Sequence, residues 1–99
     1  MLDNDIIHSR PRLLILVLLS SVEECNFKFL KTKLEFTDGV LSVHLSKLEE
    51  AGYVKAEKSF LNKKPNTCYS LTEPGRLALL EYIEEMESLF DIVRESLQR

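Results

Sequence analysis

Residues 37–54 read TDGVLSVHLSKLEEAGYV, and the spacing of the leucines in this stretch predicts an amphipathic helix. Thr37 can act as the N-cap, and Gly52 follows as the residue that ends the helix. Three leucines recur at helical spacing and therefore share the face that would be buried: Leu41, Leu45 and Leu48. We expect a helix over residues 38–51 with one apolar face and one polar face.

A shorter helix is expected just before this one. Asn26 can cap a helix that runs to Leu34, with its lysines away from the apolar face. Its apolar residues again recur at helical spacing: Phe27, Leu30 and Leu34. A turn at Glu35 and Phe36 separates the two helices. Two helices joined by so short a connection are a candidate helix-turn-helix motif.

The apolar run Leu13–Leu19 is expected to form a helix over residues 10–22 rather than a buried strand. Ser9 stands before the run as a candidate N-cap, and Pro11 suits a first helical turn. A helix that is apolar on every side must be buried on every side. We therefore expect it at the centre of the fold or partly at a subunit interface.

Beyond Gly52 the apolar period changes from helical to two, which predicts a β-hairpin. The first strand is expected over residues 53–60 and the second over residues 67–71. The tip would be Leu61–Asn66, whose proline and two asparagines suit a turn. Together with the helices, this predicts a mainly helical α+β fold with a two-stranded β hairpin.

A long helix is expected to end the chain, from Pro74 to Gln98, with Thr72 as its N-cap. At ~1.5 Å per residue it would be roughly 37 Å long, more than a domain of ~100 residues easily covers. Six apolar residues along it follow the spacing of a coiled-coil seam: Leu79, Ile83, Met86, Phe90, Val93 and Leu97. We expect a partner chain to cover this seam, which makes these six residues the predicted dimer interface.

The length of 99 residues suits one domain over residues 1–99, with a core over 8–73 and a C-terminal dimerisation helix over 74–99. The chain is 44% hydrophobic and 29% charged, which is typical of globular proteins and argues against a disordered or collagen-like chain. Two cysteines, Cys25 and Cys68, are too few for a disulfide scaffold and favour a reducing compartment. We expect the cytoplasm.

The net charge of −3 is unevenly distributed along the chain. Residues 26–71 carry eight lysines against five acidic residues, whereas residues 72–99 carry three arginines against seven acidic residues. Positive charge is therefore concentrated on the helix-turn-helix candidate and the hairpin. The overall acidity does not argue against a polyanionic partner.

The order of helix, helix-turn-helix, hairpin and long helix resembles the winged helix-turn-helix domain of bacterial and archaeal transcription regulators of the MarR and ArsR kind. The resemblance covers residues 8–82 and is carried by three stretches: HSRPRLLIL (8–16), LSVHLSKLEEAGYV (41–54) and KPNTCYSLTEPGR (64–76). It implies a recognition helix in the major groove of double-stranded DNA, a hairpin wing on the phosphates or minor groove, and a terminal helix that forms a homodimer. It also implies repression of a pseudo-palindromic operator in response to an effector.

Two groups of residues are candidates for DNA contact. The polar face of the recognition helix comprises Thr37, Asp38, Gly39, Ser42, Val43, Ser46 and Lys47. The wing and its flank contribute Lys28, Lys58, Asn62, Lys63, Lys64 and Asn66. The chain departs from the family at Val43, where the residue is frequently basic, and at the wing tip, which frequently holds arginine. Lysine lacks the bidentate fork of arginine, so we expect modest base discrimination and strong salt dependence.

The sequence contains no GxSxG, no HExxH and no phosphate-cradling glycine loop, so we expect a protein that is not an enzyme. No ligand-spaced pair of His or Cys occurs, and we expect no metal and no cofactor. The run Leu13–Leu19 is too short to cross a bilayer, so no membrane partner is expected. Two alternatives remain open: a winged-helix module for protein interaction without DNA binding, and a single-stranded nucleic acid or RNA binder.

Overall fold

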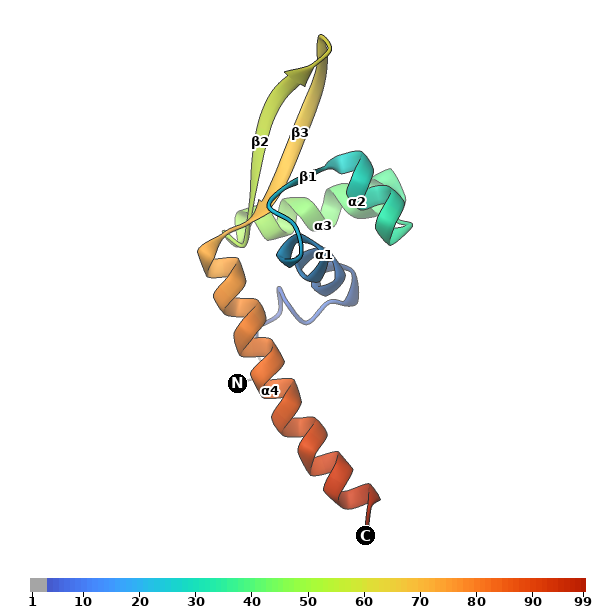
Figure 1. The fold of residues 1–99 in the computed structure, drawn as a ribbon, viewed down its shortest axis with the longest axis vertical. Coiled ribbons are helices and arrows are strands. Elements are labelled where there is room, and N and C mark those ends of the chain that lie inside the picture. The colour runs from blue at the N-terminus through green and yellow to red at the C-terminus, as the bar shows by residue number, and fades with distance from the viewer. Residues whose placement is uncertain (1–3) are drawn as a thin grey trace.

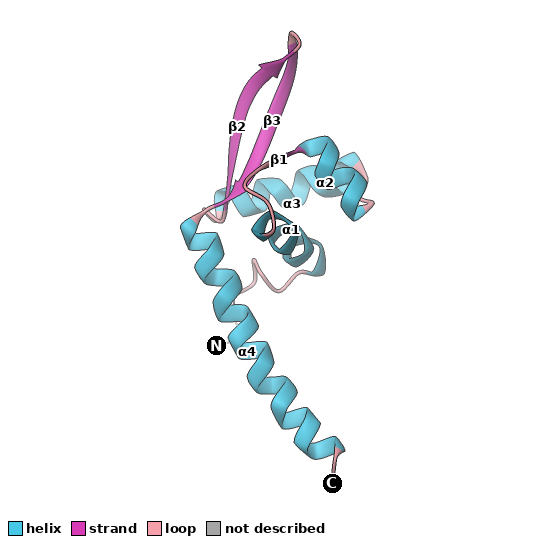
Figure 2. Ribbon diagram, viewed as in Figure 1, coloured by secondary structure: helices cyan, strands magenta, loops and turns pink. Residues whose placement is uncertain are grey.

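Four helices and one small antiparallel sheet make up the part of the chain, residues 4–99, that the computed structural model describes. The expected mainly helical α+β fold with a long C-terminal helix is confirmed (Figures 1 and 2). Residues 1–3 of the expected domain lie outside the described residues. The elements follow in the order α1 (Arg10–Ser20), β1 (Cys25–Asn26), α2 (Phe27–Leu34), α3 (Asp38–Glu50), β2 (Val54–Leu61), β3 (Lys64–Leu71) and α4 (Glu73–Leu97).

The helices α1, α2 and α3 cluster around a core of leucine and isoleucine, and the hairpin and α4 leave this cluster in opposite directions (Figure 1). The core includes the predicted apolar face of α3: Leu41, Leu45 and Leu48. In α1, Ile15, Leu16 and Leu19 are buried, but Val17 is 49% exposed. Within the described residues, 4–99, α1 is therefore not buried on every side of a single chain, which leaves the expected alternative of a place partly at a subunit interface.

Three of the four predicted helix caps form hydrogen bonds. The side chains of Asn26, Thr37 and Thr72 each accept from the backbone N–H three residues later, at 2.9, 3.2 and 3.1 Å. Ser9 occupies the N-cap position of α1, but its side chain makes no cap hydrogen bond. Its backbone carbonyl instead accepts from the N–H of Leu13 at 2.8 Å, as the first helical hydrogen bond.

Gly52 ends α3 as predicted. It adopts a φ of +80°, in the left-handed region that glycine enters without steric cost. The N–H groups of Gly52 and Tyr53 donate to the carbonyls of Glu49 and Leu48, each at 3.0 Å, which is the Schellman arrangement. This reversal directs the chain from the recognition-helix candidate straight into β2.

The wing turn is tighter than the predicted tip over residues 61–66. Only Asn62 and Lys63 form the turn, with φ of +52° and +67°, and Leu61 pairs with Lys64. Positive φ at both central residues is the type I′ geometry that matches the twist of the strands. Pro65 therefore lies inside β3, which is tolerated because β1 borders β3 only at Cys68 and Tyr69.

The strand β1 is absent from the sequence-based expectation. It spans only two residues, Cys25 and Asn26, which pair with Tyr69 and Cys68 of β3, so the sheet has three strands in the order β1-β3-β2. A two-residue strand has no detectable alternation. Its pairing connects the start of α2 to the wing and so fixes the two against each other.

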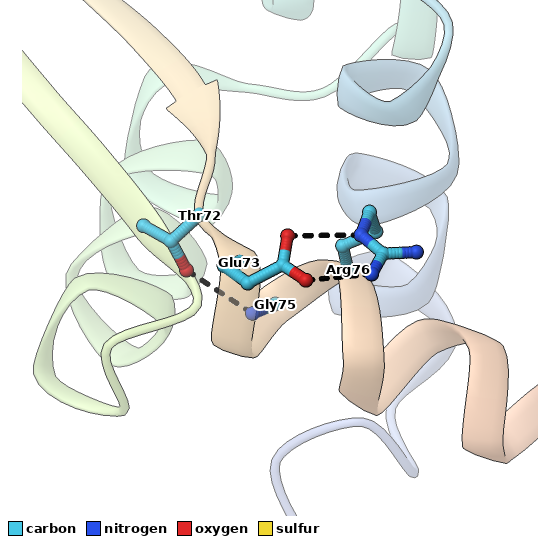
Figure 3. Close-up of polar contacts among 4 residues, drawn as sticks. All are labelled: Thr72, Glu73, Gly75 and Arg76. Atoms are coloured by element: carbon cyan, nitrogen blue, oxygen red, sulfur yellow. Dashed lines mark hydrogen bonds and ion pairs between the residues drawn. The ribbon is translucent and has the colours of Figure 1, made fainter.

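The start of α4 is joined to the base of the wing (Figure 3). The hydroxyl of Thr72 donates to the carbonyl of Gly52 at 2.6 Å and accepts from the N–H of Gly75. Gly75 is buried, and a Cβ there would overlap the carbonyl oxygen of Tyr53. The exposed ion pair between Glu73 and Arg76, at 2.6 Å, closes the first turn.

Candidate nucleic-acid interface

The face of α3 opposite its three leucines is open to solvent. All seven residues predicted for DNA contact on this helix are exposed: Thr37, Asp38, Gly39, Ser42, Val43, Ser46 and Lys47. Thr37 is already engaged as the N-cap, through the N–H of Val40. The middle of the exposed face consists of Ser42, Val43 and Ser46, which offer two hydroxyls and one small apolar side chain.

Asp38 lies at the start of α3, where its negative charge would repel DNA phosphates. Lys31 of α2 forms an ion pair with it at 2.8 Å. The side chains of Lys31 and Asp38 are 44% and 72% exposed, so the pair is solvated and contributes little to stability. It does offset the one acidic charge among the predicted contact residues.

The outer part of the wing is basic. Lys58, Lys63 and Lys64 are exposed, and residues 58–71 contain no acidic residue. Asn62 is exposed in the turn, whereas Asn66 is half-buried and its backbone carbonyl accepts from the hydroxyl of Ser59 at 3.3 Å. The wing residues therefore form one positively charged projection, apart from Asn66, which is partly used within the hairpin.

Lys28 lies across a groove from the basic part of the wing. An opening of about 640 Å³ lies between the start of α2 and the outer wing. One side is lined by Asn26, Phe27 and Lys28, and the opposite side includes Lys64. The pairing of β1 with β3 thus brings Lys28 and Lys64, which lie far apart in sequence, to a single groove.

A contact between α1 and α3 that the sequence did not suggest helps to hold α3 in place. The guanidinium of Arg12 lies 3.1 Å from Nδ1 of His44 and donates to the carbonyls of Ile6 and Asp5 at 2.6 and 3.0 Å. Burial, then the charges of Arg12 and Lys47, lowers the pKa of His44. A neutral His44 ring can accept from Arg12 at Nδ1, and this ties α3 to α1 and the segment before it. The two residues lie 32 positions apart, so no local pattern could reveal the pair.

The predicted coiled-coil seam on α4 divides between the core and the surface. Leu79 is only 6% exposed and packs in the core of its own chain, so it is not available to a partner. Phe90 and Leu97 are 55% and 79% exposed. The other seam residues are exposed or half-buried: Ile83, Met86 and Val93.

An apolar groove of about 320 Å³ continues this surface between α1 and α4. It is lined by Leu13 of α1 and by Tyr82, Ile83, Met86, Glu87 and Phe90 of α4. The sequence analysis allowed α1 a place at a subunit interface but did not single out Leu13, because the predicted interface residues all lie on α4. The unpaired apolar surface therefore belongs to both helices.

Both cysteines are free thiols of intermediate exposure. Burial, and to a smaller extent the neighbouring Cys68, raises the pKa of the Cys25 thiol, which favours the unreactive protonated form. Among residues 4–99, no cluster of three or more His, Cys, Asp or Glu side chains could hold a metal ion. No helix within the same residues is long and apolar enough to cross a membrane.

Comparison with known proteins places this geometry in a family. Residues 12–90 match the family model of the winged helix DNA-binding domain. A curated relative from Methanocaldococcus jannaschii, a protein of uncharacterised function, is 44% identical over 84 residues. The match covers 85% of this chain and 91% of the relative.

Solved structures are similar in fold. A transcriptional regulator homologue from Pyrococcus horikoshii OT3 superposes with a TM-score of 0.86 at 24% identity, covering 92% of this chain and 90% of that chain. A protein from Porphyromonas gingivalis W83 assigned to the MarR family gives a TM-score of 0.70 at 24% identity, covering 85% of this chain and 80% of that chain. At these identities the likeness concerns the fold alone.

Proposed function

The chain belongs to the winged helix DNA-binding domain family, and we propose that it is a cytoplasmic transcription repressor, not an enzyme, that binds double-stranded DNA as a homodimer. One observation carries the proposal most directly. The basic wing projects at one end of the molecule with α3 near its base, and the acidic α4, which carries the exposed apolar seam, extends toward the other end (Figure 1). A surface suited to DNA is thus separate from a surface suited to a second chain.

In this proposal α3 enters the major groove. Ser42 and Ser46 can donate to phosphates or base edges, and Val43 suits the methyl group of thymine. Lys47 at the end of the exposed face and the wing lysines reach the phosphates. Because the phosphate contacts outnumber the base contacts, affinity should depend strongly on salt and modestly on sequence.

The proposed dimer forms through α4 and α1. The helix α4 has 25 residues, about 37 Å at ~1.5 Å per residue, and every residue after Met86 is exposed in the single chain. A second copy that packs on the seam would cover Phe90, Val93 and Leu97. Two recognition helices related by a two-fold axis would then read half-sites about one helical turn apart, ~34 Å. Such a dimer would repress by occupying its operator.

Selection of bound sites from random duplex DNA tests the proposal. The chain is used at low and at moderate salt, and enrichment of a pseudo-palindrome is expected at both. Ser46→Asp is the matched variant, because Ser46 is exposed and its change leaves the core intact while placing a negative charge on the groove face. Loss of enrichment in this variant supports readout by α3. No enrichment with the unmodified chain at either salt would contradict DNA binding and favour a module for protein interaction.

A further inference from the structure

The tip of the wing exposes a large aromatic side chain. Phe60 is 78% exposed and Leu61 is 59% exposed, directly before the two-residue turn. Neither side chain belongs to the core of the chain. A hairpin that only contacted phosphates would gain nothing from apolar side chains at this position, because their exposure to water is unfavourable.

The register of the hairpin places the two apolar residues on opposite faces. Phe60 pairs with Pro65, whereas Leu61 pairs with Lys64. Because side chains alternate along a strand, Phe60 shares its face with Val54 and Ala56 nearer the body. The hairpin projects beyond the body of the protein (Figure 1). The core face of β2 therefore continues along it and ends in an exposed pair, Phe60 and Pro65.

The charges around this pair indicate what it contacts. Lys58 lies two residues before Phe60 on the same face, Lys63 follows in the turn, and Lys64 lies in β3 opposite Leu61, on the other face of the hairpin. No acidic residue occurs from residue 58 to residue 71. The tip thus combines one apolar wedge with three positive charges, which is complementary to stacked bases between two rows of phosphates.

We propose that Phe60 inserts between base pairs in the minor groove of the bound duplex and kinks it, while the wing lysines hold the flanking phosphates. Apolar wedges of this kind partly unstack a base step. Pyrimidine–purine steps such as TA unstack most easily. Phe60 therefore makes the protein prefer a flexible base step under the wing. This preference comes from the ease of deforming that step, because the Phe60 side chain makes no hydrogen bond to a base edge. This role of Phe60 rests on the proposed DNA binding.

The test moves one TA step along the flank of a selected duplex and measures affinity for each position. For the unmodified chain, one position under the wing is expected to bind about tenfold more tightly than a stiff A-tract flank. Thymines at that step should become reactive to permanganate, which oxidises unstacked thymine. Phe60→Ala should abolish both the preference and the reactivity. Leu61→Ala, which changes an exposed apolar residue on the opposite face, should keep both.

Each outcome decides a separate point. Phe60 is mostly exposed, so Phe60→Ala should unfold at the same temperature as the unmodified chain. Duplex binding without a TA preference, or a preference that survives in Phe60→Ala, would overturn the wedge and leave DNA binding intact. Failure to bind any duplex would instead remove the proposed function. Binding of the unmodified chain, but not of Phe60→Ala, to vesicles of phosphatidylserine and phosphatidylcholine, with no TA preference, would overturn the wedge in favour of a membrane contact.

Discussion

Gly75 lies in the first turn of α4, where helix propensity alone would favour alanine by about 1 kcal/mol. The contact with the carbonyl of Tyr53 reverses this preference, because a Cβ would overlap an oxygen that also accepts the N–H of Thr72. We predict that Gly75→Ala lowers the free energy of unfolding by about 2 kcal/mol, which urea denaturation would measure.

Gly39 provides the matched control in another helix. A Cβ there would meet no atom within 4 Å, so Gly39→Ala should raise the free energy of unfolding by roughly 0.5–1 kcal/mol. Equal effects of the two substitutions would contradict the close approach of Gly75 to Tyr53. Because Gly39 lies on the proposed groove face, the same variant should bind duplex DNA more weakly.

His44 makes stability depend on pH. Its pKa is lowered in the folded chain from an ordinary value of 6.5, so below that pH the unfolded chain binds more protons than the folded one. The contribution of a neutral His44 is therefore complete above about pH 6.5 and is lost as the pH falls further. Protonation would also remove the acceptor for Arg12. We predict that the unmodified chain loses stability between pH 7 and pH 5.5 faster than His44→Gln, which keeps an acceptor but does not titrate.

Urea unfolding of both chains at several pH values measures this difference. Because the two chains differ only at position 44, the difference between them isolates the contribution of His44. A stability difference between the two chains that stays constant with pH would contradict the hydrogen bond from Arg12 to a neutral His44.

At the scale of elements, local sequence patterns are sufficient to predict a helix whose ends are determined by its own residues. Asn26, Thr37 and Thr72 can be identified as caps because the hydrogen bond spans three residues. The strand β1 cannot be predicted, because its two residues gain their structure only from β3, more than forty positions later. The wing turn is predicted to span residues 61–66, whereas it spans only Asn62 and Lys63. These two residues lack the glycine that usually marks a type I′ turn, so its position has no local signal.

The wing lysines should act on duplex DNA through charge alone. We predict that replacing Lys63 and Lys64 together by alanine weakens binding to all duplex sequences by a similar factor. The slope of log K against log salt should become shallower by about 0.9 for each phosphate that the variant no longer neutralises. Fluorescence anisotropy at several salt concentrations measures both. Arg99→Ala, at the far end of the chain, is the control and should leave the slope unchanged. An unchanged slope in the lysine variant would contradict the role of the wing.

For the whole molecule, the sequence predicts correctly that α4 is too long for one chain to cover, because length and periodicity are local properties. It cannot predict that Leu79 turns inward or that Leu13 extends the exposed groove, since both depend on where α1 crosses α4. The predicted interface therefore shifts by one turn along α4 and gains a contribution from α1. The extents of 62 × 25 × 21 Å reflect the wing and α4 projecting in opposite directions.

The proposed dimer can be tested on the seam itself. Phe90→Asp should raise the dimer dissociation constant by at least about a hundredfold, because it buries an unpaired charge at the interface. Phe90 is exposed in the single chain, so the monomer should remain folded by circular dichroism. Ser88→Asp, on the other side of α4, should leave the dimer intact. Sedimentation equilibrium distinguishes the two variants, and an unmodified chain that is monomeric at micromolar concentration would refute the seam as a self-association surface.

Hydroxyl-radical footprinting of the chain on a selected duplex tests DNA binding and two-fold symmetry together. We predict two protected patches of equal size, related by a two-fold axis and centred about one helical turn apart, roughly 10 base pairs. Phe90→Asp should weaken both patches together, because each half-site depends on the other. A single protected patch, or no protection at concentrations that saturate the dimer, would contradict the account.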